Sequence, residues 1–291
     1  MTDTTTAETS IELTPENRAK AAGLLLRHLR TERSRGTTHA FLSPEATTAL
    51  RALPETFQAE GGSTVVREEP KSSPEGFSSV PPLSARKEKA LQLRAIRQEI
   101  EANQALTGMD SLRDTLVFAV GNANADLMFV GEAPGAEEEK KGEPFVGPAG
   151  QLLTKIIGAM GFQRSDVYIS NIVKFRPKLP NQTTQNRQPT PEEMAPFKPY
   201  VAREVEVVQP KVIVALGRTA AEGLLDVTDS IGKARGRRFD FNGIPAFITY
   251  HPSYLLRNGA VSEKRKVWED LLIVMEEIGM PITEKQRRFF Q

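Results

Sequence analysis

Four short apolar segments, separated by helical patterns, constrain the fold of this chain more than any other feature. The segments are DLMFVG (126–131), VYISNI (167–172), KVIVALG (211–217) and PAFITYH (245–251). Each is continuous rather than alternating, which is typical of strands buried on both faces. Helical patterns occupy 149–160, 191–208, 218–225 and 263–278. This order predicts an α/β fold with three α/β/α layers around a central four-stranded, mostly parallel sheet.

The part of the chain before this pattern has a different composition. Residues 60–84 are rich in Ser, Pro, Gly and Glu and offer too little apolar surface to offset the entropy of ordering. We therefore expect a helical N-terminal extension over 1–59, a disordered linker over 60–84 and a main domain over 85–291. The main domain is expected to begin with a charged helix within 85–105.

The chain of 291 residues contains no cysteine and only three histidines. The missing cysteine excludes disulfides, a cysteine nucleophile and a cysteine-ligated zinc or iron–sulfur centre. We expect no metal and no cofactor. No apolar segment reaches the ~18 residues of a membrane span, and the N-terminus lacks a signal-peptide pattern. We therefore expect a cytoplasmic protein that does not bind membranes. Because the formal net charge is only +1, a polyanionic partner would need a local basic patch.

Polar and special residues follow the predicted strands, where ligands bind in open parallel sheets. The first strand leads into Gly131-Glu132-Ala133-Pro134-Gly135, then Glu138 and Phe145. Glycines flanking a proline make a tight loop whose amides can approach a ligand. The alternative interpretation is a core aromatic residue held between glycine turns.

Asn171 ends the second predicted strand. Its amide offers a donor beside an acceptor, which matches the O4 and N3–H edge of uracil. Cytosine presents the reverse pattern there, so a fixed asparagine could reject it. The alternative is an asparagine that only forms a turn.

His251 follows the fourth predicted strand and precedes Pro252-Ser253-Tyr254-Leu255-Leu256-Arg257. Its position opposite Asn171 favours a role in the cleft over a structural one. Two leucines beside an arginine suggest a wedge that enters a base stack while the cation holds a phosphate. The alternative is a loop that docks on the last helix. Further basic residues cluster near strand ends, namely Lys174, Arg176, Lys178 and Arg187, and Lys233, Arg235, Arg237 and Arg238.

Four motifs in this order resemble the family 4 uracil-DNA glycosylases: GEAPG…PFVGPAGQLL, VYISNIVKFRP, KVIVALGRTAAEGLL and YHPSYLLRN. The resemblance covers roughly residues 112–280. It implies an enzyme that flips uracil out of single- or double-stranded DNA and hydrolyses its N-glycosidic bond, leaving an abasic site. We expect a bacterial, nucleoid-associated monomer, with the N-terminal extension free to recruit a protein partner.

The resemblance also implies roles for individual residues. Phe145 would stack on the flipped uracil, Asn171 would read its O4 and N3 edge, and His251 would stabilise the charge developing on O2. Glu132 and Glu138 would both act in catalysis beside His251. Glu132 would also line the pocket, and Glu138 is the candidate for positioning the attacking water, with Glu132 as the alternative. Gly131, Ala133, Pro134, Gly135 and Gln151 would lie around the base. The residues expected to contact DNA are Lys174, Arg176, Arg235, Ser253, Tyr254, Leu255, Leu256 and Arg257.

One departure from the family pattern concerns its iron–sulfur cluster, which four cysteines normally hold. Phe175 and Phe197 stand where two of these cysteines are expected, and the other two would fall near 106–112. Our hypothesis is that both phenylalanines, with Met109 or Leu112, fill the cluster's volume as an apolar core. The intervening loop, through KLPNQTTQ, is also longer than the family pattern.

Two alternatives to an active uracil-DNA glycosylase remain at this point. One is a non-catalytic module of the same fold that binds DNA or uracil-containing DNA. The other is a glycosylase for a different deaminated base, such as hypoxanthine or xanthine.

Overall fold

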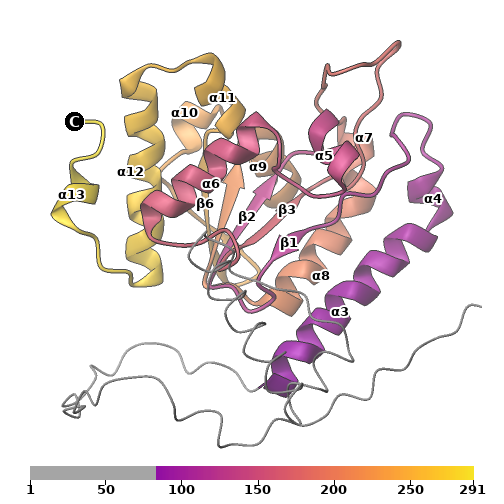
Figure 1. Ribbon diagram of the computed structural model, residues 1–291, viewed down its shortest axis with the longest axis horizontal. Coiled ribbons are helices and arrows are strands. Elements are labelled where there is room, and N and C mark those ends of the chain that lie inside the picture. The colour runs from indigo at the N-terminus through magenta and orange to yellow at the C-terminus, as the bar shows by residue number, and fades with distance from the viewer. Residues whose placement is uncertain (1–82) are drawn as a thin grey trace, which may run out of the picture. The chain divides into compact units, whose positions relative to one another are not determined.

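The computed structural model describes residues 83–291, which begin with helix α3 (Leu83–Ala102) and the short α4 (Gln104–Thr107) (Figure 1). The charged helix expected within 85–105 is therefore present, and it starts just before the predicted end of the linker. The expected extension over 1–59 and nearly all of the expected linker lie outside the described residues.

The sheet has six strands in the order β1-β3-β2-β4-β6-β5. The four predicted strands form its parallel centre as β2 (Leu127–Gly131), β3 (Tyr168–Asn171), β4 (Val212–Leu216) and β6 (Ile244–Thr249). Two antiparallel edge strands, β1 (Val120–Gly121) and β5 (Arg238–Phe241), complete it. The predicted strand number of four was therefore wrong, although the prediction of a mostly parallel sheet is confirmed.

The edge strands have weaker sequence signals than the central ones. β1 is too short to show a periodic pattern. β5 alternates between exposed and half-buried positions, and it joins β6 through Asn242 and Gly243, which have φ of 52° and 85°. Positive φ at both positions is what a tight hairpin turn requires, and Asn-Gly is its strongest sequence signal.

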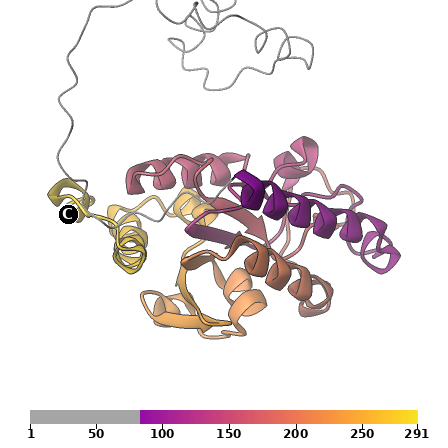
Figure 2. The same cartoon turned by 90° about the horizontal axis from the view of Figure 1, so that it is seen from below.

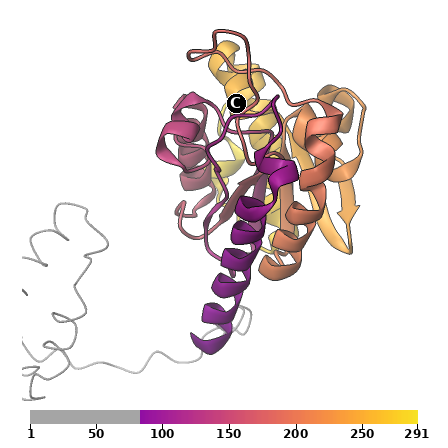
Figure 3. The ribbon, with the colours of Figure 1, turned by 90° about the vertical axis from the view of Figure 1, so that its right-hand side faces the viewer.

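Helices cover both faces of the sheet, and each face carries its own apolar core (Figure 2). Along β2, Met128 and Val130 pack toward one core, whereas Leu127 and Phe129 pack toward the other. The first core includes residues of α3, α8 (Lys198–Val208) and α9 (Arg218–Leu225), with α3 running alongside α8 (Figure 3). The second includes α6 (Pro148–Met160), α11 (Pro252–Arg257) and α12 (Val261–Ile278).

The helical pattern over 191–208 is divided into three pieces. These are α7 (Pro191–Met194), the 3-10 helix η2 (Ala195–Phe197) and α8. Thr190 and Glu193 form a reciprocal capping box at the start, and Pro196 cannot donate a backbone hydrogen bond. The remaining short helices are α5 (Ala136–Lys141), α10 (Ile231–Ala234) and α13 (Glu284–Arg287).

Phe175 and Phe197 pack against each other inside the first core. Their side chains are almost fully buried, and their ring centroids lie 6.0 Å apart. Leu106 and Leu112 are buried in the same core, and Met109 packs against it. This packing supports the hypothesis that apolar side chains fill this region. Since the chain has no cysteine, a cysteine-ligated cluster is excluded.

No helix in the described part of the chain is long and apolar enough to span a membrane.

Candidate active site

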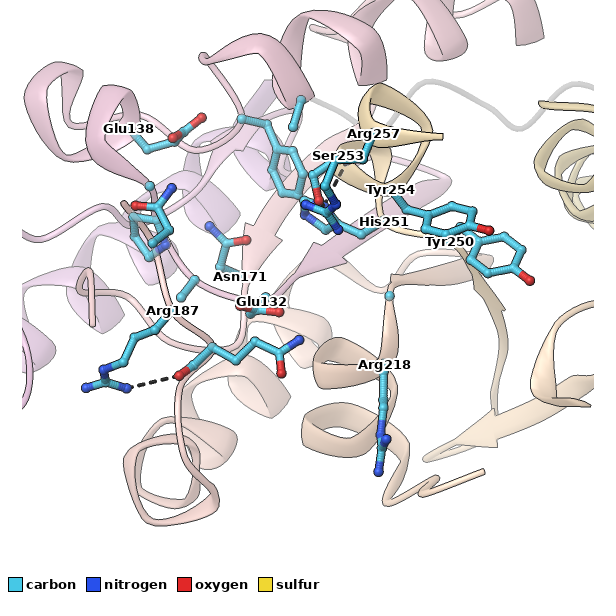
Figure 4. Close-up of a pocket in the computed structure, with 18 of the residues that line it drawn as sticks. Glu132, Glu138, Asn171, Arg187, Arg218, Tyr250, His251, Ser253, Tyr254 and Arg257 are labelled. Carbon is cyan, nitrogen blue, oxygen red and sulfur yellow. Dashed lines mark hydrogen bonds between the residues drawn. The ribbon is translucent and has the colours of Figure 1, made fainter. Parts of the chain in front are cut away.

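A cavity of about 480 Å³ opens at the carboxyl ends of the parallel strands (Figure 4). The loops after β2, β3, β4 and β6 all contribute to its wall. Its lining includes Glu132, Ala133, Pro134, Gly135, Glu138, Phe145, Ala149, Asn171, Asn186, Arg187, Gln188, Gly217, Arg218, Ile231, Tyr250, His251, Ser253, Tyr254 and Arg257. The cavity therefore lies where the strand order predicts a ligand site.

Phe145 and Asn171 meet above Gly131, the last residue of β2. A Cβ atom added to Gly131 would overlap both the Phe145 ring and the Asn171 Oδ1 atom. The backbone of Phe145 has a φ of 54°, an uncommon conformation for a bulky residue. Gly150 allows it, because a Cβ there would overlap the Phe145 carbonyl. The two glycines thus bring an aromatic face and an amide to one place.

Asn171 ends β3, paired in register with Gly131 of β2. The residue is only 2% exposed. It lines the cavity, and its side-chain amide makes no hydrogen bond to the other cavity residues drawn in Figure 4. Buried amides normally have partners, so this amide is available to a ligand that enters the cavity.

His251 is the N-cap residue of α11, and its Nδ1 accepts a hydrogen bond from the Ser253 backbone N–H at 3.2 Å. The Ser253 Oγ lies 2.8 Å from the same nitrogen. We therefore assign the proton of the neutral ring to Nε2. Burial, assisted by the positive charge of Arg257, lowers the pKa of His251 to about 4. His251 is thus a neutral hydrogen-bond donor at physiological pH.

The position of His251 depends on Gly217, which follows β4 with a φ of 91°. A Cβ added to Gly217 would lie 2.9 Å from the His251 Cβ. The His251 ring lies beside that of Phe145, with 5.6 Å between their centroids. The ends of β2, β3, β4 and β6 therefore all contribute to one arrangement of side chains.

The two carboxylates of the cavity have different surroundings. Glu138 Oε1 accepts hydrogen bonds from the backbone N–H groups of Val146 at 2.9 Å and Gly147 at 2.8 Å. Burial raises the pKa of Glu132, although a hydrogen bond with Thr219 and the charge of Arg257 oppose this rise. Two backbone N–H groups thus hold the Glu138 carboxylate beside the Phe145 loop, whereas burial disfavours the charged form of Glu132.

Most of the expected pocket residues line the cavity, with two exceptions. Gly131 lies beneath it and acts by leaving room for its neighbours. Gln151 is exposed on α6 and does not line the cavity. Along α11, Leu255 is buried in the second core, whereas Leu256 is 51% exposed. Of the two leucines expected to form a wedge, only Leu256 is exposed. Leu255 instead packs α11 against the second core.

Three of the expected DNA contacts are engaged inside the protein. Lys174 is fully buried in an ion pair with Glu204. Burial leaves it no surface with which to contact DNA, contrary to expectation.

Arg176 is also buried, and it donates to Glu139, Asn186 and the carbonyls of Thr183 and Gln185. Its guanidinium is therefore committed to organising the loop over 178–190 instead of a phosphate.

Arg235 pairs with Asp270 and donates to the Lys266 carbonyl. These contacts tie the segment before β5 to α12, and they likewise use the guanidinium internally.

The long loop over 178–190 supplies site residues that were not singled out for the pocket. Asn186, Arg187 and Gln188 line the cavity. Arg187 makes a bidentate ion pair with Glu193, which, together with hydrogen bonds, lowers the pKa of Glu193 to about 2 although burial opposes this. Arginine contacts of this kind bring the end of the loop back to the cavity. Sequence analysis could not find them, because such contacts leave no periodic pattern in the sequence.

Comparison with known proteins agrees with this geometry. Residues 118–272 match the family described as the Uracil DNA glycosylase superfamily. This chain belongs to that superfamily. The type-4 uracil-DNA glycosylase of Thermotoga maritima is 47% identical over 161 residues, covering 55% of this chain and 81% of the relative. That of Archaeoglobus fulgidus is 41% identical over 153 residues, covering 50% and 74%. The resemblance to the type-4 family is thus confirmed.

Proposed function

We propose that this protein is a uracil-DNA glycosylase, a hydrolase that releases uracil from DNA and leaves an abasic site. The observation that carries the proposal is the convergence of Phe145, Asn171 and His251 on one cavity. An aromatic face, a free amide and a neutral imidazole donor are what a pocket needs to stack a flipped uracil, read its edge and stabilise its charge. The type-4 relatives support the same reaction.

Uracil recognition would divide between Phe145 and Asn171. The base stacks on the phenylalanine ring, and the amide of Asn171 donates to O4 and accepts from N3–H. Cytosine would place a donor against a donor at the first of these positions, which costs a buried hydrogen bond. The amide makes no hydrogen bond to the other cavity residues drawn in Figure 4, which leaves it free for this pairing.

Bond cleavage would depend on His251 and on one of the carboxylates. As the N-glycosidic bond breaks, its electron pair moves onto uracil, and negative charge gathers on O2. The His251 Nε2–H then donates to O2, an interaction that strengthens only as this charge develops. Water adds to C1′ of the sugar and gives its proton to Glu138, whose Oε1 is already held by two backbone N–H groups.

DNA contact would come from the exposed end of α11. Leu256 enters the space that the flipped base leaves, and Arg257 holds a nearby phosphate. Ser253 and Tyr254 lie on the same helix at the cavity wall. The expectations of a monomer, a cytoplasmic location and a protein partner for the N-terminal extension stay predictions.

The decisive experiment uses a labelled oligonucleotide that contains one uracil, treated with the protein and then with alkali. Cleavage at the uracil is expected from wild type, with His251→Ala slowed by about 100-fold, as for loss of one charge-stabilising donor. Exposed Phe290, far along the chain from the cavity residues, supplies the control Phe290→Ala. Tight uracil-DNA binding without cleavage would support a non-catalytic module, and cleavage only at inosine would support another base specificity.

A further inference from the structure

Tyr250 and Tyr254 form a stacked aromatic pair at the edge of the cavity. Their ring centroids lie 4.5 Å apart, and their planes differ by 16°. Both residues line the cavity and are partly exposed. Figure 4 places the pair on the far side of His251 from Asn171, pointing outward. His251 thus lies between the pair and the Asn171 amide. The two tyrosines have no part in the proposed uracil contacts.

Hydrogen bonds hold this pair in place. The Tyr254 hydroxyl donates to Glu263 Oε2 at 3.0 Å and accepts from the Asn258 amide at 3.2 Å. Glu263 is also paired with Lys266 on the same helix. Tyr250 follows the end of β6 and rests on the Tyr254 ring. An aromatic surface that is already ordered loses little entropy when a ligand stacks on it.

Two cationic side chains line the same cavity as the pair. Arg218 and Arg257 are exposed and line the same cavity. Neither forms an ion pair with any residue that the structure describes, unlike Arg176 and Arg235. The wall of one cavity thus holds an aromatic face and two guanidinium groups that form no ion pair among the described residues. This combination matches a nucleotide, which has a π-face and a phosphate.

We propose that the Tyr250–Tyr254 pair is a second base-binding site, which stacks on the unpaired nucleobase next to the flipped uracil. Arg218 and Arg257 contact the phosphates on either side of that nucleotide. This proposal rests on the proposed function. In a duplex the neighbouring base is paired and stacked, whereas in a single strand it is free to bind. The second site therefore favours uracil in single-stranded DNA.

The test compares wild type, Tyr250→Ala and Tyr250→Phe on single-stranded and duplex oligonucleotides that contain one uracil. On the single strand, Tyr250→Ala is expected to raise KM about tenfold, the typical effect of losing one base–aromatic contact. Tyr250→Phe keeps the ring and is expected to restore most of the affinity. The effect on duplex substrate is expected to be much smaller. Phe290→Ala, which removes an exposed aromatic ring outside the cavity, is the matched control.

A second arm identifies the stacked base. An abasic tetrahydrofuran replaces the nucleotide on one flank of the uracil, then on the other. One of these changes is expected to raise KM for wild type about tenfold but to have little further effect in Tyr250→Ala. Additive effects of the two changes, or equal losses on single-stranded and duplex substrates, would overturn the second site.

Direct binding separates this proposal from the proposed function. Fluorescence anisotropy with a uracil-free single strand is expected to show weaker binding for Tyr250→Ala. Arg218→Ala is expected to reduce the slope of log affinity against log salt by about 0.7. If wild type excises no uracil, the proposed function fails, while this binding still tests the second site. Unchanged binding in both variants would reject the second site even if excision is normal.

Discussion

The rings of Phe145 and His251 lie side by side, with centroids 5.6 Å apart and planes tilted by 33°. They come from loops after two different strands, β2 and β6, that are separated in the sheet by β4. The arrangement depends on small residues beneath it, because Gly131 and Gly217 leave the space that both side chains occupy. Two glycines without chemistry of their own therefore set the geometry of the site.

Gly131→Ala should disable the site without unfolding the protein. The new Cβ would overlap both the Phe145 ring and Asn171 Oδ1, so one of them must move. Displacing a site group by about 1 Å costs about 100-fold in rate, and we expect that loss in kcat/KM for uracil excision.

The matched control is Gly158→Ala, because a Cβ there meets open space in the interior of α6. Gly158→Ala should keep full activity and gain up to about 1 kcal/mol of stability. Equal activity of the two variants would refute the packing argument.

The pH dependence of excision should show no loss at the ordinary pKa of histidine. His251 acts as a neutral donor, and burial keeps its pKa near 4. Its neutral form therefore persists as the pH falls through 6.5. We expect kcat/KM to show no step from His251 between about pH 5 and 8. A fall in rate with an apparent pKa near 6.5 that disappears in His251→Gln would contradict this assignment.

The same shift should reduce folding stability in acid. Between about pH 6.5 and 4, the unfolded chain binds a proton at His251 that the folded chain excludes. The stability from this group is thus complete above pH 6.5 and is lost as the pH falls toward 4. Urea unfolding at several pH values should show a shallower decline for His251→Gln than for wild type. Parallel curves for the two proteins would show that His251 ionises equally in both states.

The central strands and the main site residues could be predicted because their signals are local. Continuous apolar segments marked β2, β3, β4 and β6, and the strand-end rule then pointed to Asn171 and His251. The edge strands were missed because β1 is two residues long and β5 is half exposed. An edge strand is partly exposed to solvent, so fewer of its residues must be apolar. Its hydrophobic pattern in the sequence is therefore weaker.

The basic residues could not be assigned from sequence for a different reason. Lys174 and Arg176 precede a polar loop, which suggests an exposed patch. Their actual partners, Glu204 and Glu139, lie 30 and 37 positions away in the chain. Whether a cation faces solvent or a buried carboxylate depends on such distant pairing. Arg257 was expected from sequence to hold a phosphate, and it does line the cavity. Arg218, which lines the same cavity, was not singled out, because one arginine at the start of a helix gives no distinctive signal.

The Phe175–Phe197 contact should contribute strongly to stability. Both rings are buried, with centroids 6.0 Å apart. Truncating a buried phenylalanine to alanine typically costs about 3–5 kcal/mol, and we expect this for Phe197→Ala in urea unfolding. Phe197→Leu, which retains most of the volume, should cost much less. A decrease of less than about 1 kcal/mol in the free energy of unfolding of Phe197→Ala would show that this contact contributes little to stability. Purified wild type should contain no stoichiometric iron.

The buried ion pair between Lys174 and Glu204 should act on stability and leave the salt dependence of DNA binding unchanged. Burial lowers the pKa of Lys174, while Glu204 opposes the shift. Glu204 also accepts hydrogen bonds from Tyr168 at 3.0 Å and Ser170 at 2.8 Å. Lys174→Met would leave this carboxylate buried without its cation, and we expect a loss of about 3–5 kcal/mol.

The double variant Lys174→Met with Glu204→Gln is the decisive comparison for this pair. Glutamine keeps an acceptor for the two hydroxyl groups and removes the uncompensated charge, so most of the lost stability should return. Anisotropy titrations of a uracil-free single strand should give the same slope of log affinity against log salt for wild type and for this variant. A slope reduced by about 0.7, the effect of losing one phosphate contact, would show instead that Lys174 leaves its buried partner to reach DNA.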